Sequence, residues 1–395
     1  MTTTIQQVLR PLFITCFIIG LYVYPLNSSE SRVKWVIYLS ILYSATVWLV
    51  YGYLWYYIVS IFSLDTLFPV TILLIVIEIN IIATITCAIF SIYYNKKLQM
   101  CIKKLNAVDD TLKELGSSNI YRKMHIWSKG VITGWIVYSF ALNFIDSLAW
   151  QILLIDKATL WRFFVAHIYT YCLHVNTFVD SVFIIFLWYI GTRFDEVNKH
   201  MQNLLLKKEH WLRNTWKKPT IITHQYTLGT NNDKRVLWSS MHLHLELCHI
   251  AREWNLIFGL QMTIEAASYP ISVTALALNL YKFLSNTLAY QEGQSVHLWL
   301  RVINWTFVII GKMYIFNYIC ENVSIKANKI DKIVNELSLQ YPDSLREIYQ
   351  FTLQTMHKPL KFTGMGFFDF GNKFLIKFCT TITTYVIIMV QMSNT

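Results

Sequence analysis

The chain has 395 residues, of which 55% are hydrophobic, 16% aromatic and only 14% charged, and its formal net charge is +11. Soluble domains carry about a quarter charged residues, and disordered chains are poor in aromatic residues. This composition therefore indicates an all-α polytopic membrane protein, and it disfavours a soluble enzyme, a nucleic-acid-binding protein and a secreted disulfide-linked domain. In a membrane protein the excess of Lys and Arg reports orientation rather than an acidic partner.

The cysteines are scattered along the chain and form no Cys-x-x-Cys pair or His/Cys spacing typical of a metal site. We therefore expect no disulfide framework, no bound metal and no cofactor. The seven positions are Cys16, Cys87, Cys101, Cys172, Cys248, Cys320 and Cys379.

Apolar stretches of membrane length occur along the whole chain. A spanning helix needs about 20 mostly apolar residues. Seven stretches meet this requirement, at 35–63, 67–94, 130–155, 163–191, 254–284, 298–319 and 372–392. An earlier apolar run at 12–26 is shorter and is flanked by Pro11 and Pro25, so it predicts an interfacial or re-entrant segment rather than an eighth span or a signal peptide.

Basic residues concentrate on one side of these spans. They fall in the segment before the first span and in the loops at 95–129, 192–253 and 320–371, whereas the alternate loops are short and nearly neutral. The positive-inside rule then predicts a cytoplasmic N-terminus and an extracellular C-terminus in the cell membrane, the reverse of a G-protein-coupled receptor. The expected organisation is a cytoplasmic segment 1–34, a six-helix ligand-binding domain 35–319 with cytoplasmic extensions, anchor helices 320–371 and a last helix 372–395.

The cytoplasmic loops carry apolar side chains at helical spacing, which predicts amphipathic helices outside the bilayer. These helices either lie on anionic lipid or, as we favour, extend the spans into a cytoplasmic bundle, with contacts between subunits as one arrangement. The stripes comprise Val197, Met201, Leu204, Leu205 and Leu212, then Ile330, Ile333, Val334 and Leu337, and finally Leu345, Ile348, Tyr349, Thr352, Leu353 and Met356.

The last predicted span ends in Thr384-Tyr385, five apolar residues and Gln391, and it follows a Gly- and Phe-rich stretch at 364–370. This ending resembles the C-terminal motif of the insect gustatory receptors, with Met392 standing where the family pattern has Phe. The opening Pro11-Leu12-Phe13 and the inverted seven-span pattern agree with the same family.

The resemblance implies a homotetrameric, tastant-gated, non-selective cation channel embedded in membrane lipid. In that family the last helix of each subunit lines a central pore, cytoplasmic helices anchor the subunits, and a small-molecule tastant enters a pocket among the other spans. The nearer alternative is an odorant-receptor-type channel subunit. A secondary transporter is disfavoured by the low Gly and Pro content and the lack of a repeat. Membrane metal chemistry is disfavoured because the His242, His244 and His249 run lacks a completing motif.

Ionisable residues inside predicted spans are rare unless they face the bundle interior or water. Those in the outer half, together with nearby aromatic residues, predict an aromatic pocket with a few polar anchors, which favours an amphiphile over a sugar. Asp180 and Lys312 lie deeper and are expected to be structural. The predicted ligand-binding residues are Glu78, Asp146, Trp150, His167, Tyr171, Glu265, Tyr269, Trp299, Arg301 and Trp305.

One face of the last span combines polar and apolar side chains, because residues at about 100° intervals align along a helix. In a four-fold assembly this face predicts a gate at Ile388 and Met392, with the Gln391 amides replacing part of the hydration of a permeant cation. Thr384 can either face the pore or, like Tyr385, bond a neighbouring span, and Asp369 can pair with Lys373. The predicted stripe is Lys373, Lys377, Thr381, Thr384, Ile388 and Gln391.

Overall fold

The computed structural model describes residues 5–21, 30–61, 68–118, 120–153, 159–215, 223–285, 292–340 and 345–393. Their regular structure is helical apart from one small antiparallel strand pair, β1 (Thr363–Gly364) with β2 (Phe368–Asp369). The helices are α1 (Ile5–Ile18), α2 (Glu30–Ile61), α3 (Phe68–Tyr93), α4 (Asn95–Glu114), α5 (Tyr121–Leu153), α6 (Thr159–Thr215), α7 (Thr223–Ser285), α8 (Glu292–Asn328), α9 (Ile330–Gln340), α10 (Leu345–His357) and α11 (Asn372–Ser393).

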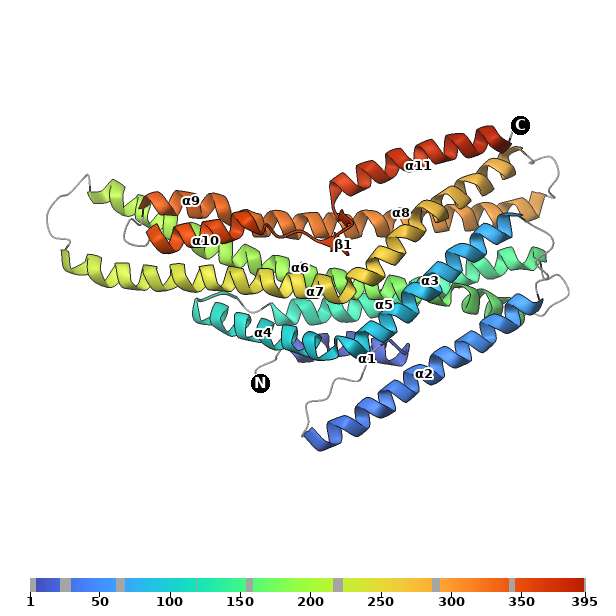
Figure 1. The fold of residues 1–395 in the computed structure, drawn as a ribbon, viewed down its shortest axis with the longest axis horizontal. Helices are drawn as coiled ribbons and strands as arrows, with labels where there is room; N and C mark the ends of the chain where they lie inside the picture. Colours follow the sequence, from blue (N-terminus) through green and yellow to red (C-terminus); the bar gives the residue numbers. More distant parts are fainter. Residues whose placement is uncertain are drawn as a thin grey trace.

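The long helices run roughly along one axis and form an elongated bundle (Figure 1). Within the described residues, five apolar stretches are long enough to cross a membrane. They are Trp35–Ser60, Ile75–Tyr93, Tyr121–Leu148, Phe163–Lys207 and Trp299–Ser338. These stretches lie in α2, α3, α5, α6 and α8, and they confirm an all-α membrane protein. α7 and α11 correspond to the other two predicted spans, so the count of seven remains a prediction.

Helix α6 forms the centre of the bundle. Of its apolar stretch 72% is buried, against 17% for that of α2, whose aromatic and aliphatic side chains point outwards. It packs against α2, α3, α5, α7, α8 and α9. A polar side chain on a helix that is buried on most sides needs a polar partner inside the protein. The polar side chains of α6 and their partners are therefore the candidates for an internal site.

The extensions of α6 and α7 pack with α9 and α10 at one end of the bundle (Figure 1). Their predicted apolar stripes are covered within the chain: Val197, Met201 and Leu204 of α6 and Ile333 and Leu337 of α9 are all buried. This burial favours a helical bundle within the chain over helices lying on lipid.

The stripe of α10 differs from the prediction. Ile348, Phe351 and Thr355 are its buried residues, whereas Tyr349 and Met356 are more than half exposed. The helix is rotated so that part of the predicted stripe faces outwards, away from the bundle of its own chain. The Leu345 and Leu212 side chains lie outside the described residues.

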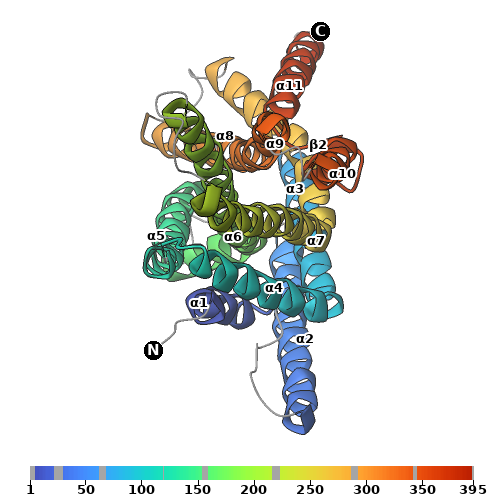
Figure 2. The ribbon, with the colours of Figure 1, turned by 90° about the vertical axis from the view of Figure 1, so that its left-hand side faces the viewer.

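The first helix is a packed part of the bundle. α1 lies beside α4 and α5 (Figure 2) and buries one apolar face that includes Leu9, Leu12 and Phe13. The turn that follows α1 is fixed by hydrogen bonds from α2, because the Gly20 oxygen accepts from Ser44 Oγ at 2.5 Å and from Trp48 Nε1 at 3.0 Å. The apolar run at 12–26 was predicted to be interfacial or re-entrant, and its described part, up to Leu21, packs inside the protein. Residues 22–26 lie outside the residues that the structure describes.

Candidate functional site: buried polar clusters and the last helix

The first buried cluster, here called the Asp146 cluster, joins α5 to α8. Asp146 is almost completely buried, and Trp305 Nε1 donates to its two carboxylate oxygens at 3.1 and 3.2 Å. Arg301, one turn before Trp305 on α8, places Nε 3.5 Å from Asp146 Oδ1. Three of the predicted ligand-binding residues therefore meet, and an indole and a guanidinium offset the charge of a carboxylate that burial alone would disfavour.

A histidine pair on α6 extends this cluster. Asn143 of α5 bonds His167, and its Oδ1 accepts from Thr170 Oγ1 at 2.7 Å and contacts His174 Nε2 at 3.1 Å. The His174 ring lies 6.2 Å from the ring of Trp305. Among the described residues His174 Nδ1 has no hydrogen-bond partner, so the cluster retains one buried polar atom that a ligand could satisfy.

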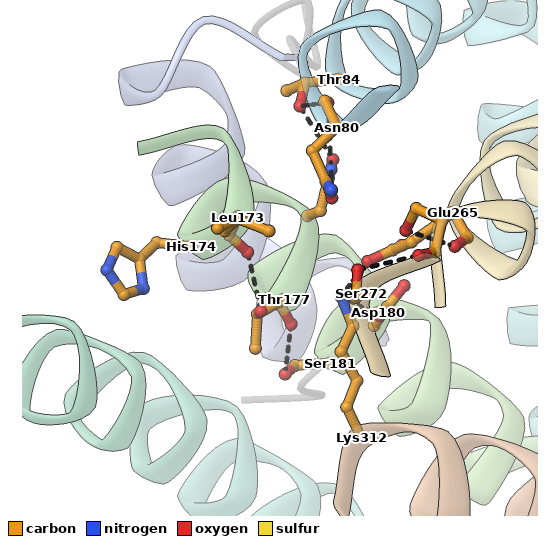
Figure 3. Close-up of polar contacts among 12 residues, drawn as sticks. Asn80, Thr84, Leu173, His174, Thr177, Asp180, Ser181, Glu265, Ser272 and Lys312 are labelled. Carbon is orange, nitrogen blue, oxygen red and sulfur yellow. Dashed lines mark hydrogen bonds and ion pairs between the residues drawn. The ribbon is translucent and has the colours of Figure 1, made fainter. Parts of the chain in front are cut away.

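The second cluster, the Lys312 triad, joins α6, α7 and α8. Lys312 extends from α8 towards Asp180 of α6 and Glu265 of α7 (Figure 3). Its Nζ lies 2.8 Å from Asp180 Oδ2, contacts Glu265 Oε1, and lies 6.0 Å from the centre of the Tyr269 ring. All three charged side chains are largely buried, so each depends on the others for its charge balance.

The triad regroups the predicted residues. Glu265 and Tyr269 were predicted with the ligand pocket, whereas Asp180 and Lys312 were expected to be structural, yet the four lie together. His174 of the Asp146 cluster points to a different side of α6 (Figure 3). The two clusters are therefore separate groups along the same central helix.

Other predicted ligand-binding residues lie elsewhere. Tyr171 packs against Trp48 and Tyr51 and donates to the Ile19 oxygen at 3.3 Å, so it ties α6 to α2 and α1. Glu78 is exposed on α3, and Trp299 is half-buried in the first half of α8. The Trp150 side chain lies outside the described residues.

Two polar groups were missed by the sequence analysis. Asn176 of α6 bonds Thr84 Oγ1 at 2.9 Å and Asn80 Oδ1 at 3.0 Å across to α3. The signal was available, because Asn80 interrupts a long run of Ile and Leu, where an amide must find a partner.

The other missed group joins α4, α5 and the extension of α6. Arg193 Nε pairs with Asp109 Oδ1 at 2.7 Å, and Tyr121 and Tyr189 donate to Asp109 Oδ2. Burial raises the pKa of the Asp109 carboxyl by more than Arg193 lowers it. No local sequence pattern predicts the pairing of Asp109 with Arg193, because the two residues lie on different helices.

An apolar cavity lies between α1, α3, α4, α6 and α7. None of its lining residues belongs to the predicted pocket, which shows that the predicted polar anchors do not surround this space. The lining residues are Phe13, Cys16, Leu21, Cys87, Ser91, Tyr94, Leu98, Val179, Val182, Ile257 and Phe258.

Helix α11 lies at the edge of the bundle, where it packs against α7 and α8 (Figure 1). Only Ile382 is buried among its described side chains, and the whole predicted stripe from Lys373 to Gln391 is exposed. Thr384 donates to Thr380 O of its own helix at 3.1 Å, and Tyr385 is 55% exposed, so among the described residues neither makes the expected bond to a neighbouring span. The helix continues past Met392, but that side chain is not described.

The cationic end of α11 also differs from expectation. Asp369 pairs with Lys361 at 3.0 Å rather than with Lys373. Among the described residues no group of three or more His, Cys, Asp or Glu side chains is placed to hold a metal ion. All seven cysteines are free thiols, and Cys379 is the exposed one.

By its fold and its interior, the molecule is a helical protein of membrane-protein type with buried polar clusters. The family model described as 7tm Chemosensory receptor matches residues 9–394, so the chain belongs to that family and is a chemoreceptor rather than an enzyme. The predicted resemblance to insect gustatory receptors is thereby confirmed as membership of the chemosensory receptor family.

Two kinds of relative agree with this assignment. A Drosophila melanogaster protein named "Putative gustatory receptor 28b" is 22% identical over 323 residues, which cover 76% of this chain but only 65% of that protein. The chain thus matches less than two thirds of the length of that relative. The fold is similar to the insect olfactory receptor OR5 from Machilis hrabei, with a TM-score of 0.64, 13% identity and 98% of each chain covered. The same receptor in complex with eugenol gives a TM-score of 0.60 at 14% identity and the same coverage.

Proposed function

We propose that this chemoreceptor is a tastant-gated, non-selective cation channel of the cell membrane, in which four copies surround one pore lined by α11. The observation that carries the proposal is the exposed polar face of α11. A helix of about membrane length that offered Thr381, Thr384 and Gln391 to lipid would leave polar groups in hydrocarbon. Copies of the same helix around a water-filled axis remove that cost.

The orientation proposed with this channel follows the basic loops. The N-terminus and the extensions of α6 and α7 are cytoplasmic, and α11 ends outside the cell. The exposed side chains of α10, including Tyr349 and Met356, then face the cytoplasm at the edge of each subunit. They form the surface through which we propose that four copies contact one another, because an apolar face in water needs a partner.

The ligand site that we propose is the Asp146 cluster. It brings together Asp146, Arg301, Trp305 and the two histidines of α6, and His174 Nδ1 remains available. OR5 is described in complex with eugenol, and a small organic ligand with an aromatic or amphiphilic body is the class that we propose here. The fold likeness to an olfactory receptor keeps an odorant-type channel as the second candidate, which a panel of tastants and odorants distinguishes.

The pore is tested by two substitutions and a matched control. Ile388→Ala should raise the current measured without ligand, because it widens an apolar constriction, and Gln391→Ala should change ion selectivity. Ile387→Ala removes the same atoms from the neighbouring exposed position and should do neither. Normal basal current and selectivity in both pore variants would exclude α11 as the pore lining.

The ligand site is tested by one substitution on each of the two helices that form the Asp146 cluster, α5 and α8. Asp146→Asn and Trp305→Phe should each raise the ligand concentration for half-maximal response without changing unitary conductance, because pocket and pore are separate. Thr306→Val is the control, since its hydroxyl donates to Val302 O of its own helix at 2.7 Å. Responses that vanish when G proteins are blocked in a non-insect cell would overturn the channel proposal.

A further inference from the structure

Helix α8 connects the proposed ligand site to the start of α11. Arg301 and Trp305 lie in its first half, Lys312 follows two turns later, and Asn317 lies beyond it on the same helix. Asn317 is 1% exposed. A buried carboxamide must satisfy both its donor and its acceptor, so its partners identify its role.

The partners of Asn317 are its own helix and the residue that precedes α11. Its Nδ2 donates to the Met313 oxygen at 2.9 Å, and its Oδ1 accepts from the Gly371 N–H at 2.8 Å. The Gly371 oxygen then accepts the first bonds of α11, from Phe374 and Leu375 at 3.0 and 3.2 Å. The side chain thus binds the residue from which the proposed pore helix begins.

The backbone at this point tolerates only glycine. Gly371 has φ +140°, and a Cβ there would collide with the carboxylate of Glu321, which is also on α8. The neighbouring Phe370 packs edge-on against Phe316 of α8, with ring centres 4.8 Å apart. The start of α11 is therefore seated on one turn of α8 by an amide, a close backbone approach and an aromatic contact.

A second asparagine of α8 holds the same linker farther from the pore helix. Asn328 exchanges two hydrogen bonds with the backbone of Leu360, at 3.1 and 3.4 Å. Three turns of helix separate it from Asn317. The chain thereby offers a matched residue that fixes the linker but does not touch Gly371.

We propose that Asn317 is a positioning residue for gating, which holds the start of α11 so that the constriction formed by four copies stays closed until α8 moves. The inference rests on the proposed channel function and adds the element that couples the ligand site to the pore. A ring of side chains closes a pore only when every copy of α11 keeps its place, so a loosened start opens it. The net free energy of one hydrogen bond changes an equilibrium constant by about fivefold, so its loss should shift the balance between the closed and the open pore by that factor.

The test compares two isosteric substitutions in the full-length receptor. Asn317→Leu should raise the basal current about fivefold and lower the ligand concentration for half-maximal response, with unchanged unitary conductance and selectivity. Asn328→Leu removes as many hydrogen bonds from the same helix and linker and should gate as the unmodified protein does. Surface level and oligomer size are measured for both, so that currents are compared per assembled channel.

A glycine pair keeps the test informative if Asn317→Leu does not assemble. Gly371→Ala should reproduce the basal current, because a residue with a Cβ is strained at φ +140° and the start of α11 must shift to relieve that strain. Gly366→Ala also places alanine at a positive φ, +81°, but meets no atom within 4 Å, so it should leave gating unchanged.

Three results would overturn the inference. Asn317→Leu and Gly371→Ala could both show the basal current of the unmodified receptor, or Asn317→Leu could raise rather than lower the ligand concentration for half-maximal response. The third is a rise in basal current for Asn328→Leu equal to that for Asn317→Leu. Failure of the channel proposal looks different. In that case the unmodified protein itself gives no ligand-gated current once G proteins are blocked.

Discussion

Removing Lys312 should destabilise the receptor more than any other single substitution in its polar interior. Lys312→Met keeps most of the side-chain volume but leaves the Asp180 and Glu265 carboxylates facing each other without a cation. At the 2.8 Å separation of Lys312 Nζ and Asp180 Oδ2, and an effective dielectric constant of about 20, the lost attraction is about 6 kcal/mol. Desolvation offsets part of it, so a net cost of about 3–5 kcal/mol is expected.

That cost is a large share of the stability of a typical protein, about 5–15 kcal/mol. It can be measured as the temperature at which the detergent-solubilised receptor loses its size-exclusion peak. A triple variant, Lys312→Met with Asp180→Asn and Glu265→Gln, is the matched control. It removes the cation and both anions together and should regain most of the lost stability, because no unpaired charge remains buried.

The reasoning fails if Lys312→Met melts at the same temperature as the unmodified receptor. That result would mean that water reaches the triad and screens its charges. It also fails if the triple variant is no more stable than the single one, because the loss would then come from packing around the lysine stem rather than from charge.

The remaining predictions concern orientation, assembly and pH. An epitope placed after Thr395 should be labelled on intact cells and the sequon at Asn322 should carry no glycan; a glycan there would reverse the proposed orientation. Leu353→Asp combined with Met356→Asp should abolish tetramers in detergent while each subunit stays folded, and unchanged oligomer size would place the subunit contact elsewhere. Burial lowers the pKa of His244 to about 4 from an ordinary value of 6.5, so the unfolded chain binds the extra proton between these values and stability falls as pH falls. At pH 5 the loss of stability is about 2 kcal/mol. His244→Gln should remove this pH dependence of the melting temperature. A pH dependence that persists in His244→Gln would have to come from another group.

Much of the architecture could be predicted because it depends on local pattern. Apolar runs of about 20 residues identify helices that can cross a membrane, and five of the seven predicted runs meet that criterion in the described residues. The stripe at Ile330, Ile333 and Leu337 faces a protein core as its spacing indicates. The ending Thr384-Tyr385 with Gln391 indicated the receptor family, and the family match over nearly the whole chain agrees.

The grouping of the polar residues could not be predicted in the same way. Asp146, Arg301 and Trp305 were expected to meet and do meet, but Glu265 was expected with them and instead lies with Lys312. Depth in the membrane can be estimated from position along a span. Which neighbouring helix a side chain faces depends on the rotation of each helix about its axis.

The membrane class, the helical elements and most of the apolar faces follow from composition and from periods of a few residues, and the resemblance of the C-terminal motif indicated the receptor family. The outward turn of Met356 on α10, the contacts of Tyr171 with α1 and α2, and the hold of Asn317 on Gly371 depend on the packing of the folded chain. These contacts join residues on different helices, and 152 positions separate Tyr171 from Ile19. Such pairs are set by how whole helices pack and rotate, and a hydrophobic period carries no information about the partner on the other side.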